Sequence, residues 1–396
     1  MKFSVLPILI FLFVSLVFAE FPKSDDLDNE YEIDIFMDYF LPERNFAYLA
    51  SSSGIRVTAG SLDIKRLYLQ EELKIKLPLV NDKLWTRFFH IRNKTIDYER
   101  TFDEIEFEYS PLSKIYLSVL GTPEFYKHNA DLGWAIRYAK DEGNGFKLAY
   151  ILADFDNNYA FQHRTTNLGF EKFYQKTPKK WRIEIKKIGH NIKSYIFFEC
   201  NTKSVFSYDD LMDTTKNYSE SHESYFIDSN FSLSICSNWK FCTDFYIRET
   251  KNKKEFTIPQ QAQDFNDAEK KYLVRPFVEQ YLLNSVRLFY GFSFVKHYLS
   301  LQNYDYTRTN IGGFLSVVLN ICSNTELEVG YIHDDVDWTK NSQSEYNREN
   351  RLKLAIEYKF TEKSQIKLIT GWDLDKEDWG TFAFFDGGHI QLQILF

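Results

Sequence analysis

The stretch Leu352-Lys353-Leu354-Ala355-Ile356-Glu357-Tyr358-Lys359-Phe360 decides the fold, because its side chains alternate with a period of two. Every even-numbered residue in it is apolar, and three of the four odd-numbered residues are charged. Successive side chains of an extended strand point to opposite faces, so this stretch predicts a strand with one apolar and one polar face. We expect the even-numbered residues to face lipid and the odd-numbered ones to face water.

The same alternation recurs along most of the chain, in segments of about nine to thirteen residues. That is the length a tilted strand needs to cross a bilayer. Further examples of the alternation are residues 105–109, 132–138, 181–186, 239–247, 286–294, 327–331 and 366–372. No segment after the first nineteen residues follows a helical period.

Short and long connections alternate between these segments, which predicts an up-and-down meander with tight turns at one end and larger loops at the other. A Greek-key sandwich would not keep this parity. The short connections lie near 81–83, 111–113, 143–145, 189–191, 237–238, 284, 323–324 and 361–363. The long ones lie near 93–100, 122–130, 156–178, 203–222, 250–269, 299–307, 334–348 and 374–385. We therefore expect an all-β fold, a transmembrane antiparallel up-and-down barrel of about 18 strands, with about 16 as the alternative.

The N-terminus has the features of a cleaved secretory signal. One lysine precedes an apolar run that ends at Ala19, and the run is too short to span a bilayer comfortably. The alternative is an uncleaved anchor. The expected organisation is a signal peptide over residues 1–19, an N-terminal segment over 20–53 that could include the first strand, and the β-barrel over 54–396.

The last ten residues form an alternating strand with an aromatic end. This strand resembles the C-terminal signal strand of bacterial outer-membrane β-barrel proteins, and its apolar positions are Ile390, Leu392, Ile394 and Phe396. The resemblance implies location in the outer membrane of a Gram-negative-type bacterium, contact with outer-membrane lipid, recognition by the barrel-assembly machinery, and closure against the first strand. No particular subfamily is indicated.

Composition and motifs exclude several functions. The chain of 396 residues carries a net charge of −8 and no basic block, so nucleic acid is a poor partner. No zinc-type or catalytic spacing is present, and we expect no metal, no cofactor and no enzymatic activity. The acidic group beside His333 is typical of a solvated loop. Cys236 and Cys242 flank a tight turn; a disulfide is conceivable there, and free thiols are favoured.

The polar face of the strands carries both signs of charge and predicts a porin-like channel for passive passage of small hydrophilic solutes. The alternatives are that these charges only stiffen the wall, or that a structural or adhesive surface barrel acts through its long external loops. The interval 156–178 could fold inward as a constriction loop through His163, Arg164 and Lys172, or be an outer loop or an extra strand pair. The expected pore-lining residues are Glu104, Glu106, Arg137, Lys147, Arg182, Glu184, Lys240, Asp244, Arg248, Arg287, Glu326, Glu328, Lys353, Glu357 and Lys367.

Overall fold

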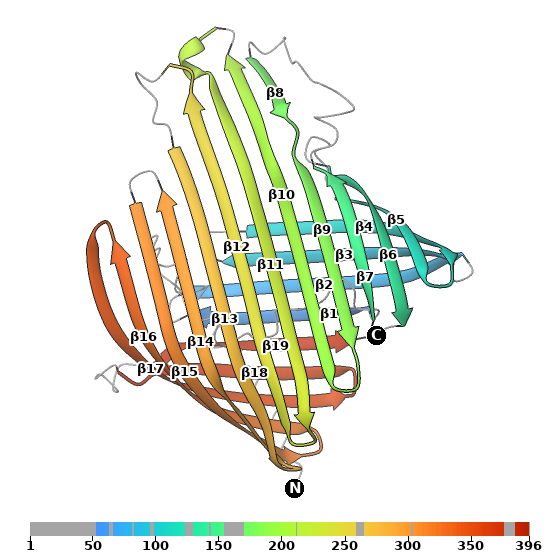
Figure 1. The fold of residues 1–396 in the computed structure, drawn as a ribbon, viewed down its shortest axis with the longest axis vertical. Coiled ribbons are helices and arrows are strands. Elements are labelled where there is room, and N and C mark those ends of the chain that lie inside the picture. Colours follow the sequence, from blue (N-terminus) through green and yellow to red (C-terminus); the bar gives the residue numbers. More distant parts are fainter. Residues whose placement is uncertain are drawn as a thin grey trace.

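The computed structural model describes residues 53–62, 66–80, 83–95, 99–122, 130–141, 144–153, 170–210, 212–258, 265–301, 304–375 and 385–395. These residues form one antiparallel sheet (Figure 1). Among them no helix is long and apolar enough to cross a bilayer. The strands are β1 (Gly54–Leu62), β2 (Arg66–Val80), β3 (Leu84–Thr95), β4 (Glu99–Leu112), β5 (Ile115–Gly121), β6 (Leu132–Asp141), β7 (Asn144–Leu152), β8 (Phe170–Lys176), β9 (Lys179–Ile188), β10 (Ile192–Asp210), β11 (Tyr218–Cys236), β12 (Trp239–Phe256), β13 (Phe265–Leu283), β14 (Val286–Leu301), β15 (Tyr304–Cys322), β16 (Thr325–Lys340), β17 (Gln343–Thr361), β18 (Ser364–Asp373) and β19 (Phe385–Leu395).

The sheet closes on itself because β1 pairs with both β2 and β19. Two of the nineteen strands share one position in the wall: β8 and β9 both pair with β10 and are separated only by Thr177 and Pro178. The strand is interrupted at Pro178 because proline has no backbone N–H and cannot donate a hydrogen bond to the neighbouring strand. The fold is thus a closed antiparallel up-and-down barrel of 18 strands, which confirms the sequence prediction.

Tight turns join the strands at one end of the barrel, as predicted. β11 and β12 are joined by Ser237-Asn238, and β17 and β18 by Glu362-Lys363. We call this the short-turn end and the opposite one the mouth. The four cysteines are free. Cys242 lies opposite Ser232 in the ladder and Cys236 opposite Trp239, so the two thiols are not cross-strand partners.

At the mouth, several intervals predicted to be loops are strands instead, and those predictions are wrong. Residues 203–222 and 250–269 largely extend β10–β13, each of 18 or 19 residues. Residues 334–348 form the upper ends of β16 and β17, joined by Asn341-Ser342 with φ of 44° and 72°. Residues 299–307 belong to β14 and β15 on either side of residues 302–303. Backbone hydrogen bonds continue the ladder there as they do in the lower parts of the same strands.

The wall is consequently uneven in height. In Figure 1, β10, β11 and β12 reach higher than β7 and β9, and β8 accompanies the upper part of β10. The structure also corrects the prediction of a constriction loop over 156–178, because Phe170–Lys176 form the strand β8. Lys172 lies opposite Tyr208 of β10 in the ladder and so belongs to the wall rather than to a loop. His163 and Arg164 lie outside the described residues, as do residues 1–52 and Phe396.

The outer face carries an apolar band that reaches from the short turns to about mid-height of the longest strands. On β11 the outward residues are mainly apolar from Tyr225 to Ile235, and above Tyr225 they are Glu223, Ser221 and Ser219. On β12 they change from apolar to charged at Glu249. Eleven residues of a strand tilted by ~40° span about 25–30 Å, the height of the apolar band of a membrane barrel.

Candidate functional site: the barrel interior

The interior of the barrel at β4–β9 is filled by side chains of opposite charge that meet from strands that are not neighbours. β4 is joined to β6 by Glu108 and Arg137, to β7 by Glu106 and Lys147, and to β9 by Glu104 and Arg182. We call these three ion pairs the corner cluster. Their N–O distances are 2.6 Å for Arg137–Glu108, 2.7 Å for Lys147–Glu106 and 2.8 Å for Arg182–Glu104.

The corner cluster exists because the inner face beneath it is made of small and apolar residues. Leu120, Ala135, Ala149 and Ile151 on β5–β7 form a buried hydrophobic core inside the barrel. Small side chains leave room for the long side chains of β4, β6, β7 and β9 to cross over them. All six charged members are buried, and Glu108 is 0% exposed. This corner of the interior is therefore closed by packed side chains.

Glu108 is the most highly coordinated member of the corner cluster. Arg137 donates to it from Nε at 2.6 Å and from Nη2 at 2.7 Å, and Arg87 of β3 donates from Nη2 at 3.0 Å. The guanidinium of Arg137 also lies 3.8 Å from the ring centre of Tyr116. Glu108 thus balances two buried cations, a geometry in which each charge depends on the others.

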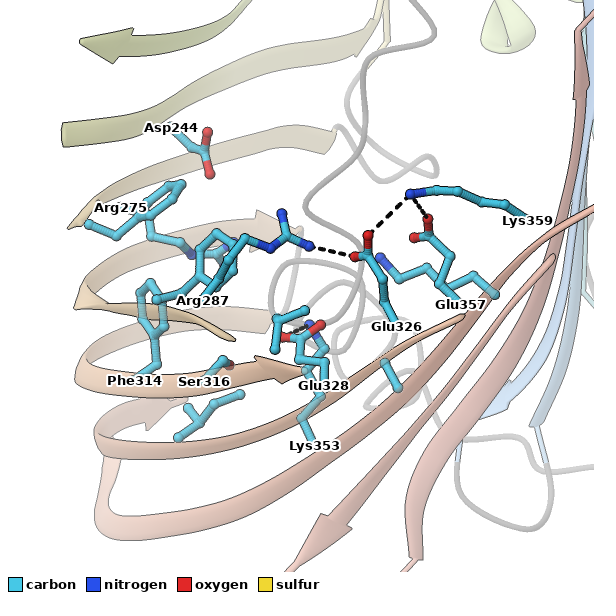
Figure 2. A pocket seen from close by; sticks show the side chains of 16 residues that line it. Asp244, Arg275, Arg287, Phe314, Ser316, Glu326, Glu328, Lys353, Glu357 and Lys359 are labelled. Carbon is cyan, nitrogen blue, oxygen red and sulfur yellow. Dashed lines mark hydrogen bonds and ion pairs between the residues drawn. The ribbon is translucent and has the colours of Figure 1, made fainter. Parts of the chain in front are cut away.

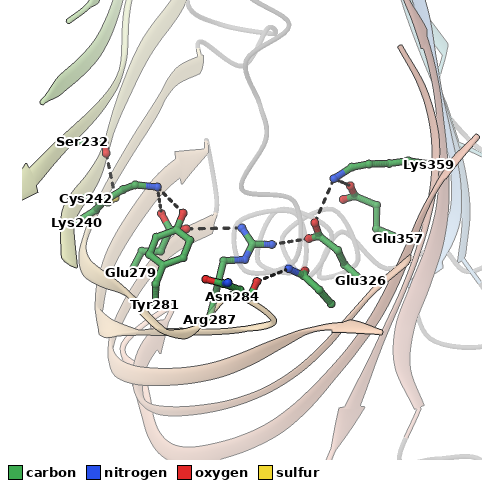
Figure 3. A network of polar contacts seen from close by, with 11 residues as sticks. Ser232, Lys240, Cys242, Glu279, Tyr281, Asn284, Arg287, Glu326, Glu357 and Lys359 are labelled. Carbon is green, nitrogen blue, oxygen red and sulfur yellow. Dashed lines mark hydrogen bonds and ion pairs between the residues drawn. The ribbon is translucent and has the colours of Figure 1, made fainter. Parts of the chain in front are cut away.

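A second arrangement, at the short-turn end, is a chain of alternating charges across β12, β13, β14, β16 and β17 (Figure 3). We call it the charge chain. Its members, in order, are Lys240, Glu279, Arg287, Glu326, Lys359 and Glu357. The successive distances are 3.1 Å for Lys240–Glu279, 3.6 Å for Arg287–Glu279, 2.5 Å for Arg287–Glu326, 3.1 Å for Lys359–Glu326 and 3.3 Å for Lys359–Glu357. Unlike the corner cluster it is partly exposed to water.

Next to the charge chain lies a cavity of about 380 Å³, which we call the lumen cavity (Figure 2). It is bounded by β12–β18 and has both charged and aromatic walls. In its wall, Lys353 of β17 pairs with Glu328 of the adjacent strand β16 at 2.8 Å. Its lining residues are Asp244, Arg275, Phe277, Arg287, Phe289, Phe314, Ser316, Val318, Glu326, Glu328, Ile332, Lys353, Ala355, Glu357, Lys359 and Lys367.

A second cavity of about 540 Å³ lies toward the mouth, on the side of β3–β11. Its lining includes Arg182, which bridges Glu104 and Glu199, with 3.0 Å to the latter. Lys180 and Asp131 also line it and pair at 2.8 Å. Hydroxyl and amide groups of Asn201, Thr202 and Ser204 complete a polar wall.

The expected pore-lining residues fall into distinct groups. Glu104, Glu106, Arg137, Lys147 and Arg182 make the corner cluster, and buried Glu184 lies beside it on β9, where it accepts a hydrogen bond from Tyr195 at 3.3 Å. Lys240, Arg287, Glu326 and Glu357 belong to the charge chain. Asp244, Glu328, Lys353 and Lys367 line the lumen cavity. Arg248 lies higher, 3.6 Å from Glu269.

Sequence reasoning missed the aromatic part of the interior. Phe277, Phe289 and Phe314 share the face of Arg275, Glu279 and Arg287 rather than the outer face. The available signal was their parity, since each stands two residues from an interior polar or charged side chain. The acidic group near His333 is divided by the strand: Asp334 is buried inside, whereas Asp335 is exposed and bonds to Arg348 and Tyr346 of β17. In the described part of the chain no group of His, Cys, Asp and Glu is suited to hold a metal ion.

Comparisons with known proteins find matches among solved structures. No protein-family model and no curated protein matches the chain. The outer membrane protein OprD from Pseudomonas aeruginosa is 11% identical with a TM-score of 0.38, over 88% of this chain and 96% of that one. OccK5 of the same organism is 9% identical with a TM-score of 0.41, over 87% and 96%. OmpT, an outer membrane protein of Vibrio cholerae, is 11% identical with a TM-score of 0.36, over 87% and 96%.

Proposed function

We propose that the protein is an outer-membrane channel for passive passage of small hydrophilic solutes. The observation that carries this proposal is the lumen cavity with its charged walls, inside a closed barrel whose outer face is apolar. A barrel of about 18 strands is wide enough to hold an aqueous path. Charges of both signs along such a path interact with the solute and its hydration shell.

The position in the outer membrane is supported by the outer apolar band and by the last strand. His389 and Gln391 of β19 are buried inside, whereas Ile394 is exposed outside, so Ile390, Leu392 and Ile394 face the lipid side. The apolar residues of β19 thus lie on one outward face, as expected for a C-terminal signal strand that the barrel-assembly machinery would recognise.

Conductance in a planar lipid bilayer tests the proposal. Purified, refolded protein should give stepwise increases in ionic current, and protein unfolded by heating before addition should give none. Folding is checked independently by the β-sheet signal in circular dichroism. A folded, inserted barrel without current would contradict the channel.

The corner cluster predicts that solutes pass along β12–β18 rather than along β5–β7. Lys359 lines the lumen cavity with a side chain that is 42% exposed, whereas Ala149 lies beneath the corner cluster and is 1% exposed. In a background with all four cysteines replaced by serine, Lys359→Cys should react with a negatively charged thiosulfonate reagent and lose current. The buried variant Ala149→Cys should stay unreactive. The reverse pattern would place the path in the wrong half of the barrel.

A surface role is the second candidate, and the observation that favours it is the projection of β10–β13 above the apolar band. The projecting part is an ordered sheet rather than a set of loops. Tyr208 and Tyr218 stack there with ring centres 5.1 Å apart, and Lys254 lies 3.9 Å from the Tyr218 ring. A rigid polar surface of this kind suits contact with a partner outside the cell. Absence of current in the bilayer experiment would leave this candidate standing.

A further inference from the structure

A group of polar side chains stands on the outer face of the barrel, directly above the apolar band on the neighbouring strands β13, β14 and β15. We call it the edge group, and its members are Lys270 of β13, Lys296 and Tyr298 of β14, and Thr307 and Thr309 of β15. The residues that alternate with them along the strands, Lys271, His297 and Arg308, are buried inside, so the edge group faces outward. On each strand the next outward residue toward the short turns is aromatic or aliphatic: Tyr272, Phe294 and Ile311.

Tyr298 lies between the two lysines of the edge group. It stands opposite Lys270 in the ladder and two residues from Lys296 on its own strand. Directly opposite residues have Cβ atoms about 5 Å apart, and diagonal neighbours such as Lys270 and Lys296 about 7–8 Å. Two flexible ammonium groups and one phenol can therefore reach the same anion above Tyr298.

The two lysines are weakly engaged within the chain. Lys296 is exposed, and its ammonium makes no ion pair or hydrogen bond with a residue that the structure describes. The side chain of Lys270 is 38% exposed and lies 3.9 Å from the carboxylate of Glu249 on β12. That carboxylate already accepts hydrogen bonds from the phenols of Tyr225 and Tyr272. Both ammonium groups are thus available to a further anion.

Hydroxyl groups complete the edge group. The side-chain hydroxyls of Tyr298, Thr307 and Thr309 bond to no side chain or backbone group in the described part of the chain. The acidic residues around the group lie one strand to either side, with Glu249 opposite Lys270 and Asp337 opposite Thr309. An anion centred on Tyr298 therefore contacts two cations and hydroxyl donors before it approaches a carboxylate.

We propose that the edge group binds the phosphate monoester of a membrane lipid on the mouth side of the bilayer, with the phosphate between Lys270 and Lys296. The acyl chains of that lipid would cover the apolar side chains of Phe294 and Ile311 below. A phosphate monoester carries a charge of about −1.5 to −2 at pH 7, which two ammonium groups balance. A choline lipid offers no net charge to two lysines, and a free phosphate compound lacks the contact with the apolar band. The site is independent of whether the barrel conducts.

Native mass spectrometry of the purified, folded protein in detergent micelles tests the proposal. The probes are dioleoyl phosphatidic acid, dioleoyl phosphatidylglycerol and dioleoyl phosphatidylcholine, which share their acyl chains, and glycerol 3-phosphate as the soluble headgroup. We expect phosphatidic acid to bind more tightly than phosphatidylglycerol, and phosphatidylglycerol more tightly than phosphatidylcholine. Glycerol 3-phosphate at the same concentration should not bind.

Variants of the edge group separate charge from shape. Lys270→Gln and Lys296→Gln should each weaken phosphatidic acid by about fivefold, the size of one lysine at an anionic lipid surface, and the double variant by about tenfold to thirtyfold. The double variant should bind phosphatidylcholine as before. Replacement of both lysines by arginine keeps the two charges and should preserve the preference for phosphatidic acid. Tyr298→Phe removes only a hydroxyl and should weaken phosphatidic acid by about threefold.

The matched control carries Lys83→Gln and Lys363→Gln, which remove two exposed charges from short turns at the opposite end of the barrel. It has the same net charge as the double edge variant and should bind phosphatidic acid like the unaltered protein. Three results would overturn the site: phosphatidic acid binding no tighter than phosphatidylcholine, equal losses in the control and in the double edge variant, or no loss in the double edge variant. Glycerol 3-phosphate binding as tightly as phosphatidic acid would refute the lipid as the ligand.

Discussion

Replacing Glu108 with alanine is expected to lower the free energy of unfolding by about 3–5 kcal/mol, because it leaves buried cations without their counter-charge. Glu108 is 0% exposed and accepts hydrogen bonds from Arg87 and Arg137. Urea titration of the protein folded in lipid vesicles, followed by the fluorescence of its tryptophans, measures the change.

The triple variant Arg87→Met, Glu108→Met, Arg137→Met removes all three charges together and should recover much of the loss. Apolar groups of similar volume can replace a buried ion cluster at little cost.

The matched control for Glu108→Ala is Glu223→Ala. Glu223 pairs with Lys251 at 3.0 Å on the projecting sheet, where the two side chains are 40% and 53% exposed. Exposed pairs of this kind contribute little to stability, because water screens the two charges. Equal losses for Glu108→Ala and Glu223→Ala would mean that water reaches the corner cluster as freely as it reaches the surface, and the closed corner would be refuted.

A lysine at Ile356 should destabilise the barrel in a membrane by about 2–4 kcal/mol, whereas a lysine at Ala355 should cost much less. Ile356 faces outward, 47% exposed within the apolar band, so a charge there must enter hydrocarbon. Ala355 faces the lumen cavity, into which a longer side chain can extend. Urea titration in vesicles of lipids with short acyl chains compares the two variants.

In detergent micelles, where water reaches the outer surface of the barrel more easily, the losses in free energy of unfolding for the two variants should differ much less. This second comparison separates the effect of hydrocarbon from a general effect of volume or charge. A soluble two-sided core would give similar damage at positions 355 and 356 in every medium.

The strands within the apolar band could be predicted from sequence, and those above it could not. Residues 352–360 alternate because one face meets lipid, and they lie in β17 as expected. The upper part of β11, Tyr218-Ser219-Glu220-Ser221-His222-Glu223, meets water on both sides and has no alternation to reveal it. There the neighbouring strands hold the segment through backbone hydrogen bonds, which leave no signature in side-chain polarity. β8 was mistaken for a loop for the same reason.

For the candidate site, the sequence could predict which side chains face the interior, but not which of them contact each other. Strand parity placed Glu106 and Lys147 on the polar side, yet their meeting at 2.7 Å across two intervening strands depends on the curvature of the wall and on the small Ala135 between them. Three-dimensional curvature is not encoded in the period of a single strand. The lumen-facing phenylalanines were missed because the expected pore-lining residues were all charged.

The pairing of β1 with β19 has a consequence for how the chain reaches its native state. Thr58 and Gln391 are hydrogen-bonded partners separated by 333 positions, while nearly every other ladder joins neighbouring segments. This pairing closes the longest loop in the described structure. We expect it to form last, because the entropy cost of bringing β1 and β19 together is low only once the intervening strands are ordered. Until then β1 and β19 each present an unpaired edge that can pair with another molecule. Folding should therefore become slower and more prone to aggregation when the final strand is weakened, even by changes that leave the completed barrel as stable as before.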